Sequence, residues 1–319
     1  MRRVLWVAAA VLAGTAPWWV PGYGLYVLTL AMVYGVAAVG LNLLTGYAGQ
    51  VSIGHAGFMA IGAYASALAT LRLGWSPWAG LVAGSAFGGI TGFLLGLPAV
   101  RLQGPYLAVA TLGFGTFVSQ LLVKWESLTG GYMGLKPPRL TLGVLPLDAE
   151  LYYVAGVILL GVVGVASALA RRSFGRALLA VRDSELAAEA TGVYVAGTKV
   201  QAFSLSAALA GLAGALQAHV VGYISPGDFT LLTSIFLVSA VVVGGLASVS
   251  GSVAGAVLLT VGFQALSGVR DLRTVLYGLL LVAAVVFFPG GLVRLSLRRR
   301  VGWAPISSAW RREERRAVS

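Results

Sequence analysis

Cysteine is absent from the 319-residue chain, charged residues make up only 10% of it, and histidine occurs twice. The absence of cysteine excludes a disulfide framework and a thiolate metal site, and it leaves the redox compartment open. His55 and His219 have neither metal-ligand spacing nor a carboxylate close in sequence. A hydrogen-bonded structural role is therefore the simpler interpretation of each histidine, and no metal site is expected.

Lysine is scarce as well, and Lys124, Lys136 and Lys199 are its only occurrences. No Gly-Lys-Ser or Gly-Lys-Thr sequence occurs, which excludes a phosphate-binding P-loop. Neither a Gly-x-Ser-x-Gly nor a His-Glu-x-x-His sequence is present, so an intramembrane hydrolase would have only His219 and two serines of the same apolar run. The chain is therefore not expected to be an enzyme.

Apolar residues fill most of the sequence, with 58% hydrophobic residues and a mean hydropathy of +0.90. Apolar runs of about 17 to 22 residues recur, and about 20 residues suffice to cross a bilayer core. The composition predicts an all-α polytopic membrane protein with about ten transmembrane helices. The ten expected spans, none of which contains Asp, Glu, Lys or Arg, are 4–20, 23–44, 51–71, 77–98, 105–123, 151–170, 200–222, 229–246, 252–269 and 274–293.

The basic residues favour one orientation of these spans. With a cytoplasmic N-terminus, 16 of the 22 basic residues lie in inside segments and 6 outside, whereas the 10 acidic residues divide five and five. This positive-inside bias predicts that both ends of the chain are cytoplasmic. The net charge of +12 would suggest nucleic acid binding in a soluble protein, but here the charges follow the sides of the membrane, so no nucleic acid partner is expected.

The spans define a transmembrane domain over residues 1–293, with a cytoplasmic segment at 171–199, followed by a basic cytoplasmic tail at 294–319. The first span has a second interpretation. Two arginines precede its short apolar run and small residues follow it, so it can also be a cleaved signal peptide. A retained helix is the commoner partner of nine further spans.

Glycine recurs every four residues in the fourth span, at Gly84, Gly88, Gly92 and Gly96. Small residues at helical spacing let membrane helices approach closely. Helix packing is the expected role of this ladder.

Two runs of Gly, Ser and amide residues, 45–57 and 243–252, interrupt the apolar sequence at comparable places in the two halves of the chain. Broken helices in corresponding positions indicate a transport pathway, because unwound backbone at membrane depth must be packed in protein or line a wet cavity. A tight cytoplasmic turn explains each run almost as well. The candidate pathway residues, at the first run and at the start of the fifth span, are Asn42, Gln50, Ser52, His55, Tyr106 and Thr111.

The segment 175–192 is the largest polar island before the C-terminal tail. Its Ala, Leu, Arg and Glu residues favour a short surface helix, for which Asp183 or Ser184 can provide the N-cap and Gly192 the left-handed end. On a single helix Arg182, Glu185 and Glu189 would share one face and suit docking into a groove of another protein. A solvated connector between two spans is the alternative.

Four segments together resemble a known family. Segments 40–56, 104–108, 175–192 and 288–292 read GLNLLTGYAGQVSIGHA, GPYLA, GRALLAVRDSELAAEATG and FPGGL, and they resemble the LivM-type permease subunit of branched-chain amino acid ABC importers. The resemblance implies an ABC importer permease fold in a bacterial or archaeal cytoplasmic membrane. It also implies a LivH-type sister permease, two cytoplasmic ATPase subunits and an extracytoplasmic solute-binding protein as partners.

The Glu-Ala-Ala element shared by ABC importer permeases resembles residues 185–192, although its spacing here is looser. The resemblance thus assigns an ATPase-coupling role to Gly175, Arg176, Arg182, Asp183, Glu185, Glu189, Ala190 and Gly192. It implies no cofactor on this chain, with ATP and magnesium bound at the partner ATPases. ATPase closure would then push on the helix around 182–192 and rock the broken spans between outward and inward openings.

A secondary transporter is a competing hypothesis on a level with the intramembrane hydrolase, but it would be expected to place a carboxylate in a span, and no expected span contains one. The resemblance leaves the substrate open. Similar permeases move leucine, isoleucine and valine, whereas others move urea, amides or other amino acids.

Overall fold

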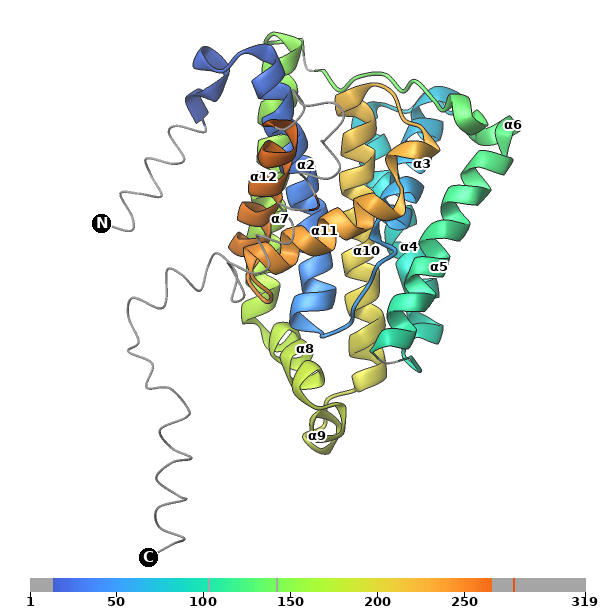
Figure 1. The fold of residues 1–319 in the computed structure, drawn as a ribbon, viewed down its shortest axis with the longest axis vertical. Helices are drawn as coiled ribbons and strands as arrows, with labels where there is room; N and C mark the ends of the chain where they lie inside the picture. The colour runs from blue at the N-terminus through green and yellow to red at the C-terminus, as the bar shows by residue number, and fades with distance from the viewer. Residues whose placement is uncertain (1–13, 103, 142, 266–277, 279–319) are drawn as a thin grey trace, which may run out of the picture.

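The computed structural model describes residues 14–102, 104–141, 143–265 and 278, which form an all-α bundle (Figure 1). In this described part there is no β-strand, and one isolated bridge joins Leu135 to Ile224. The helices in chain order are α2 (Gly22–Asn42), η1 (Leu43–Tyr47), α3 (His55–Arg72), α4 (Pro77–Ala99), α5 (Pro105–Lys124), α6 (Glu126–Thr129), η2 (Gly131–Met133), α7 (Leu147–Arg171), α8 (Ser173–Asp183), α9 (Glu185–Ala190), α10 (Val195–Val221), η3 (Pro226–Asp228), α11 (Leu231–Gly244) and α12 (Val249–Ala265).

The helices are long and apolar, which confirms the all-α membrane class. Six helical segments of the described part can cross a membrane by length and composition, and α12 is a shorter apolar helix. Eight of the ten expected spans contain one of the helices named above, and residues 14–19 of the expected span 4–20 are helical as well. The expected span 4–20 apart from its last residues, the span 274–293 apart from residue 278, and the tail 294–319 lie outside the described residues, so the count of ten stays a prediction.

Helix α10 is the centre of the bundle and packs against α2, α3 and α4. Glycines allow these contacts, because a Cβ on Gly62 would lie 2.1 Å from the Gly211 carbonyl oxygen, and one on Gly88 would lie 2.5 Å from that of Ala207. Backbones this close leave no room for a side chain, and in lipid such close packing drives helix association. The glycine ladder of α4 faces α10, as the helix-packing interpretation predicts.

The first sequence interruption ends α2 in a π-helical turn, η1, after which residues 48–54 are not helical. Helix α3 then begins at His55, whose ring lies 3.1 Å from Ser206. Ser206 is eleven residues into α10, about 16 Å from the start of that helix at 1.5 Å per residue. Helix α3 therefore starts inside the bundle, whereas Gly49 and Val51 of the preceding segment are exposed.

The second interruption separates α11 from α12. Figure 1 shows α11 crossing the bundle at a steep angle to α10, and α12 running back along α2. A Cβ on Gly244 would lie 2.0 Å from the carbonyl oxygen of Gly251, so the two helices pack closely beside their junction. Ala247 in this junction has a φ of 56° and is the non-glycine residue with positive φ in the described part. Such a conformation is strained for alanine and needs support from its neighbours.

Helices α8 and α9 connect α7 to α10 and project beyond one end of the bundle (Figure 1). The expected single helix over 175–192 is wrong, because the chain breaks at Ser184, whose φ of −163° and ψ of 117° are extended. The Ser184 hydroxyl accepts a hydrogen bond from the Ala187 N–H at 3.2 Å and so begins a new helix. Of the two expected N-caps, Ser184 is confirmed, whereas Asp183 is the last residue of α8.

Candidate functional site

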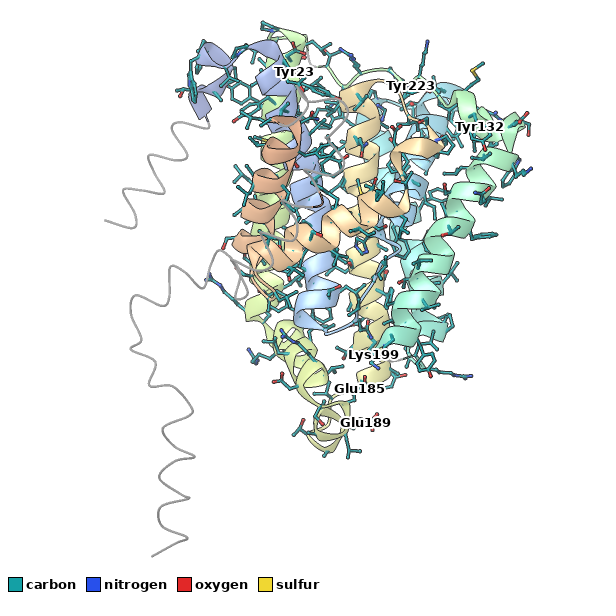
Figure 2. The ribbon with its side chains drawn as sticks, in the orientation of Figure 1. Tyr23, Tyr132, Glu185, Glu189, Lys199 and Tyr223 are labelled. Atoms are coloured by element: carbon teal, nitrogen blue, oxygen red, sulfur yellow. The ribbon has the colours of Figure 1, made fainter. Side chains whose placement is uncertain are left out.

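The break at Ser184 separates the three charged residues that were expected to share one helix face. Arg182 lies on α8 and points toward the bundle, where its Nη1 donates a hydrogen bond to the Gly46 carbonyl oxygen at 2.6 Å. Glu185 on α9 forms an ion pair of 2.5 Å with Lys199 of α10. Glu189 is exposed at the outer end of α9 (Figure 2). The shared face is therefore wrong: two of the three residues bind the bundle and the third points away from it.

Lys199 is a site residue that the sequence analysis did not identify. Helix α10 begins at Val195, five residues before the expected span, so Lys199 lies inside the helix and is only 2% exposed. A buried ammonium group is costly unless it is paired. The partner Glu185 comes from the neighbouring helix α9, and the pair joins the projecting corner to the central helix of the bundle.

The remaining expected coupling residues have distinct positions. Gly175 is buried against α7, where a Cβ would lie 2.2 Å from the Ala170 carbonyl oxygen. The Arg176 guanidinium donates to the Arg171 carbonyl oxygen at 3.3 Å, within the turn between α7 and α8. Gly192 has a φ of 85°, the left-handed conformation predicted for it.

The outer end of the corner presents a small exposed surface, which we call the tip surface. It combines charged residues with a large apolar side chain, because Leu186 is 80% exposed. The tip surface consists of Asp183, Leu186, Glu189 and Ala190.

Asn42, at the end of α2, joins the two helix breaks. Its side-chain Nδ2 donates to the Ser248 carbonyl oxygen at 2.9 Å, and its Oδ1 accepts from the Ala247 N–H at 3.0 Å. Both bonds cross from the first interruption to the second, more than 200 residues away. The two interruptions that correspond in sequence are thus in direct contact.

His55 is fully buried and hydrogen-bonded at both ring nitrogens. The Ser206 hydroxyl donates to the Gly40 carbonyl oxygen at 2.6 Å, so its oxygen accepts from His55 Nε2 at 3.1 Å. Nδ1 is then the acceptor for the Ser52 hydroxyl at 3.4 Å. This chain of bonds joins α2, α3 and α10, which is the structural role expected for a histidine without metal-ligand spacing.

Gln50 differs from its neighbours. Its side chain is 5% exposed, and neither its amide nitrogen nor its amide oxygen has a hydrogen-bond partner among the described residues. Its backbone is bonded, because its N–H donates to the Leu44 carbonyl oxygen and its own carbonyl accepts from the Thr45 hydroxyl. Gln50 is therefore the expected pathway residue with unused hydrogen-bonding capacity in this conformation.

Thr111 and Tyr106, both on α5, are placed very differently. The buried Thr111 hydroxyl accepts from the Ile53 N–H at 3.0 Å and so binds the extended segment before α3. Tyr106 is 77% exposed on the outer side of α5. Only Thr111 touches the region where α3 begins.

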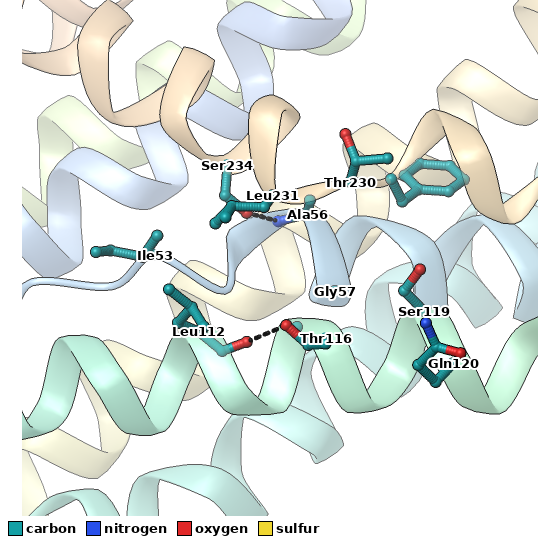
Figure 3. Close-up of a pocket in the computed structure, with 12 residues that line it drawn as sticks. Ile53, Ala56, Gly57, Leu112, Thr116, Ser119, Gln120, Thr230, Leu231 and Ser234 are labelled. Atoms are coloured by element: carbon teal, nitrogen blue, oxygen red, sulfur yellow. Dashed lines mark hydrogen bonds between the residues drawn. The ribbon is translucent and has the colours of Figure 1, made fainter.

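A cavity of about 300 Å³ lies beside the start of α3, between α5 and the start of α11 (Figure 3). Its wall includes Ser119 and Gln120 of α5 and Thr230 on the other side, and its apolar part includes Leu112 and Leu231. No charged side chain lines it, and none of the six expected pathway residues does. Sequence analysis missed this cavity because its polar residues are spaced along a helix that reads as an ordinary apolar span.

Within the described residues, no group of three or more His, Asp or Glu side chains can hold a metal ion. The described residues thus contain a cavity beside the start of α3, two helix breaks in direct contact and a polar corner that projects from one end of the bundle. This arrangement suits transport coupled to a partner.

Comparison with known proteins agrees with this geometry. Residues 23–285 match the family described as "Branched-chain amino acid transport system / permease component". The chain is 33% identical to the high-affinity branched-chain amino acid transport system permease protein LivM of Escherichia coli (strain K12), covering 92% of this chain and 76% of LivM. The LivM protein of Salmonella typhimurium is likewise 33% identical over 92% of this chain and 76% of its own length.

A more distant relative is the autoinducer 2 import system permease protein LsrC of Escherichia coli (strain K12 / DH10B), 29% identical over 94% of this chain and 90% of LsrC. No solved structure matches the chain. The family match covers most of the sequence and includes both helix breaks, the cavity and the projecting corner. The chain therefore belongs to the family of branched-chain amino acid transport system permease components and is a multi-pass membrane protein that works with partner subunits.

Proposed function

We propose that this chain is one of the two permeases of an ATP-driven importer that takes up branched-chain amino acids across a bacterial or archaeal cytoplasmic membrane. Its partners are a LivH-type sister permease, two cytoplasmic ATPases that bind ATP and magnesium, and an extracytoplasmic solute-binding protein. The observation that carries the proposal is the α8–α9 corner, a polar element that leaves the bundle at one end and ends in the tip surface. Its basic flanks, Arg171 and Arg172, favour the cytoplasmic side.

The tip surface is the proposed contact with an ATPase subunit. It presents an apolar side chain, Leu186, and an acidic one, Glu189, both exposed. Protein contacts of this kind gain affinity from a desolvated apolar anchor, while charges around it select the partner. Glu185 is not part of this contact in our proposal, because its carboxylate binds Lys199.

We assign the cavity beside the start of α3 to the translocation route, as a place where the substrate binds on its way across the membrane. Its volume is near the lower limit of ordinary small-molecule sites, about 300 Å³. Ile53, Leu112 and Leu231 can contact a branched aliphatic side chain, and the hydroxyl and amide groups of the cavity can bind the polar end of an amino acid. Weak, uncharged binding suits a passage that must release its substrate.

The outer side of α5 continues the route. Thr116 and Gln120 are exposed polar residues in the middle of a mostly apolar membrane helix. Polar groups facing lipid are unfavourable, so such a face indicates either a wet passage or a protein neighbour. In our proposal the sister permease lies across this face and closes the route from the other side.

Transport in vesicles tests the proposal directly. The complete transporter, reconstituted with its binding protein, should accumulate labelled leucine when ATP is supplied to the ATPases, and should not accumulate labelled urea. Uptake of urea instead of leucine would replace the substrate and leave the transporter class intact. Uptake driven by an ion gradient without ATP would refute the ATP-driven importer.

The coupling surface has its own test. Leu186→Asp should weaken co-purification of the ATPases by tenfold or more, because a central apolar anchor contributes on the order of 2 kcal/mol. Leu73→Asp, the same change of another highly exposed leucine in the connection between α3 and α4, is the matched control and should leave the ATPases bound. Equal ATPase recovery in the Leu186 variant would place the contact elsewhere.

A further inference from the structure

We infer that Arg182 is a positioning residue that transmits movement of the α8–α9 corner to both helix breaks, through Gly46 and Asn42. This inference rests on the proposed function, because it assumes that the corner receives the movement of the ATPases. It adds a route inside this chain from the corner to the cavity. The route consists of hydrogen bonds and close packing contacts, and its hydrogen bonds join elements that are far apart in sequence.

The first link joins α8 to the end of α2. The Arg182 guanidinium donates to the Gly46 carbonyl oxygen at 2.6 Å. That carbonyl belongs to the last residues of η1, where helical carbonyls lack partners of their own, so the arginine caps the helix end. The aliphatic part of Arg182 also packs on Gly49, because a Cβ there would lie 2.9 Å from Arg182 Cγ.

The second link joins η1 to the break between α11 and α12. A Cβ on Gly46 would lie 1.8 Å from Asn42 Oδ1 and 2.5 Å from the Ala247 nitrogen, so these three groups are in immediate contact. Asn42 then binds Ala247 and Ser248 through the two hydrogen bonds described above. With no space between them, a shift of Gly46 must move Asn42 or the junction.

The junction itself is poised to change. Ala247 holds a positive φ that alanine rarely adopts, and its N–H is held by Asn42. Strained backbone persists only where neighbours support it, and it occurs preferentially in switch regions. Releasing the Asn42 bonds would let Ala247 leave this conformation and let α11 tilt.

The far end of the route reaches the cavity. Helix α11 carries Leu231 and Ser234 in the cavity wall, and the Ser234 hydroxyl accepts from the Ala56 N–H at the start of α3. A tilt of α11 about its junction with α12 would therefore change the opening of the cavity (Figure 3). The corner and the cavity are joined by one contiguous set of packed and bonded groups.

The test uses the absence of cysteine from this chain. A cysteine introduced at Thr116 in the cavity wall reports its opening through the rate of labelling by a small polar maleimide, read from the permease band of the complete reconstituted transporter. Labelling is compared without nucleotide and with ATP and vanadate. We expect the two rates to differ about fivefold or more, the lower range of typical coupling between sites.

Arg182→Met keeps the aliphatic stem and removes the donor. In this variant the nucleotide-dependent difference should fall below about twofold while the ATPases still co-purify. Arg182→Lys, which restores a charged donor, should recover part of it. Arg172→Gln removes a similar charge at the opposite end of α8 and should behave as the parent does.

Each other result is decisive. A full nucleotide response in Arg182→Met would refute the relay and leave the proposed function standing. Loss of the ATPases from this variant would place Arg182 in the docking contact and also refute the relay. If Arg182→Met does not assemble, Asn42→Asp, which retains the acceptor and loses the donor to Ser248, must lower the response for the relay to stand. If the labelling rate of the parent transporter is the same with and without nucleotide, the proposed function itself is refuted.

Discussion

The ion pair between Lys199 and Glu185 predicts an asymmetric response to mutation. The ammonium group is 2% exposed, whereas the carboxylate side chain is 36% exposed. Glu185→Leu would leave a buried positive charge without its carboxylate. Lys199→Met would leave the carboxylate in contact with water, which can solvate it. The two single variants therefore remove the same ion pair but should lower the free energy of unfolding by different amounts.

The magnitudes follow from burial. Removing one partner of a fully buried pair costs about 3–5 kcal/mol, whereas an exposed pair contributes about 0–1 kcal/mol. Because water reaches Glu185, we expect Glu185→Leu to cost about 2 kcal/mol and Lys199→Met to cost about 1 kcal/mol or less. The double variant should be close to the cost of Lys199→Met alone, because no buried charge remains.

The assay is reversible chemical unfolding of the permease in mixed micelles, followed by tryptophan fluorescence from the eight tryptophans. Glu185→Gln is a further control, since its amide oxygen can accept a hydrogen bond from the ammonium group and should recover part of the loss. Equal costs for the two single variants, or a double variant worse than Glu185→Leu, would refute the assignment of Lys199 as the buried partner.

Three further predictions concern topology, burial and packing. A reporter fused after Arg182 should be cytoplasmic and one fused near Leu135 extracytoplasmic; the same side for both would contradict the orientation. Ser52→Cys should react with a polar maleimide far more slowly than Thr116→Cys, because Ser52 is fully buried; equal rates would mean that the start of α3 is open to water. Gly54→Ala should lower the unfolding free energy by about 1–3 kcal/mol, since its Cβ would lie 2.0 Å from a carbonyl oxygen of α5; an unchanged stability would contradict this contact.

The membrane class and most of the helices could be predicted because they depend on local composition. Runs of apolar residues must be helical in lipid, where each backbone group needs an internal partner. Helix ends were less accurate. Helix α10 begins five residues early and includes Lys199, since a charge can enter a membrane helix when another element supplies its partner. That partner lies on a separate helix and is not visible in the hydropathy of the span.

The projecting corner was predicted as a polar segment, but its geometry was not. Its composition favours helix throughout, yet Ser184 takes extended backbone because its hydroxyl gains a hydrogen bond from the next helix. The direction of Arg182 depends on Gly46, 136 positions away in the chain. Local propensity contains no information about a contact of that separation.

The pathway residues illustrate a different limit. A polar group in a membrane segment avoids lipid in one of two ways: it faces a wet cavity, or it finds a hydrogen-bond partner within the protein. Asn42 and His55 adopt the second solution, since each is buried and bonded to other helices. The cavity instead uses Ser119 and Gln120, whose position on the exposed side of α5 depends on how the helices are arranged.

The two helix breaks also explain each other. Non-helical backbone inside a membrane protein leaves N–H and carbonyl groups that need partners. Thr111 supplies an acceptor for Ile53 of the first break, and Asn42 supplies both a donor and an acceptor to the second. Asn42 lies at the edge of the first break, so the two breaks share its hydrogen bonds. The two sequence interruptions therefore meet at one shared site, where the Asn42 side chain and the backbone of Ala247 and Ser248 satisfy each other's hydrogen bonding.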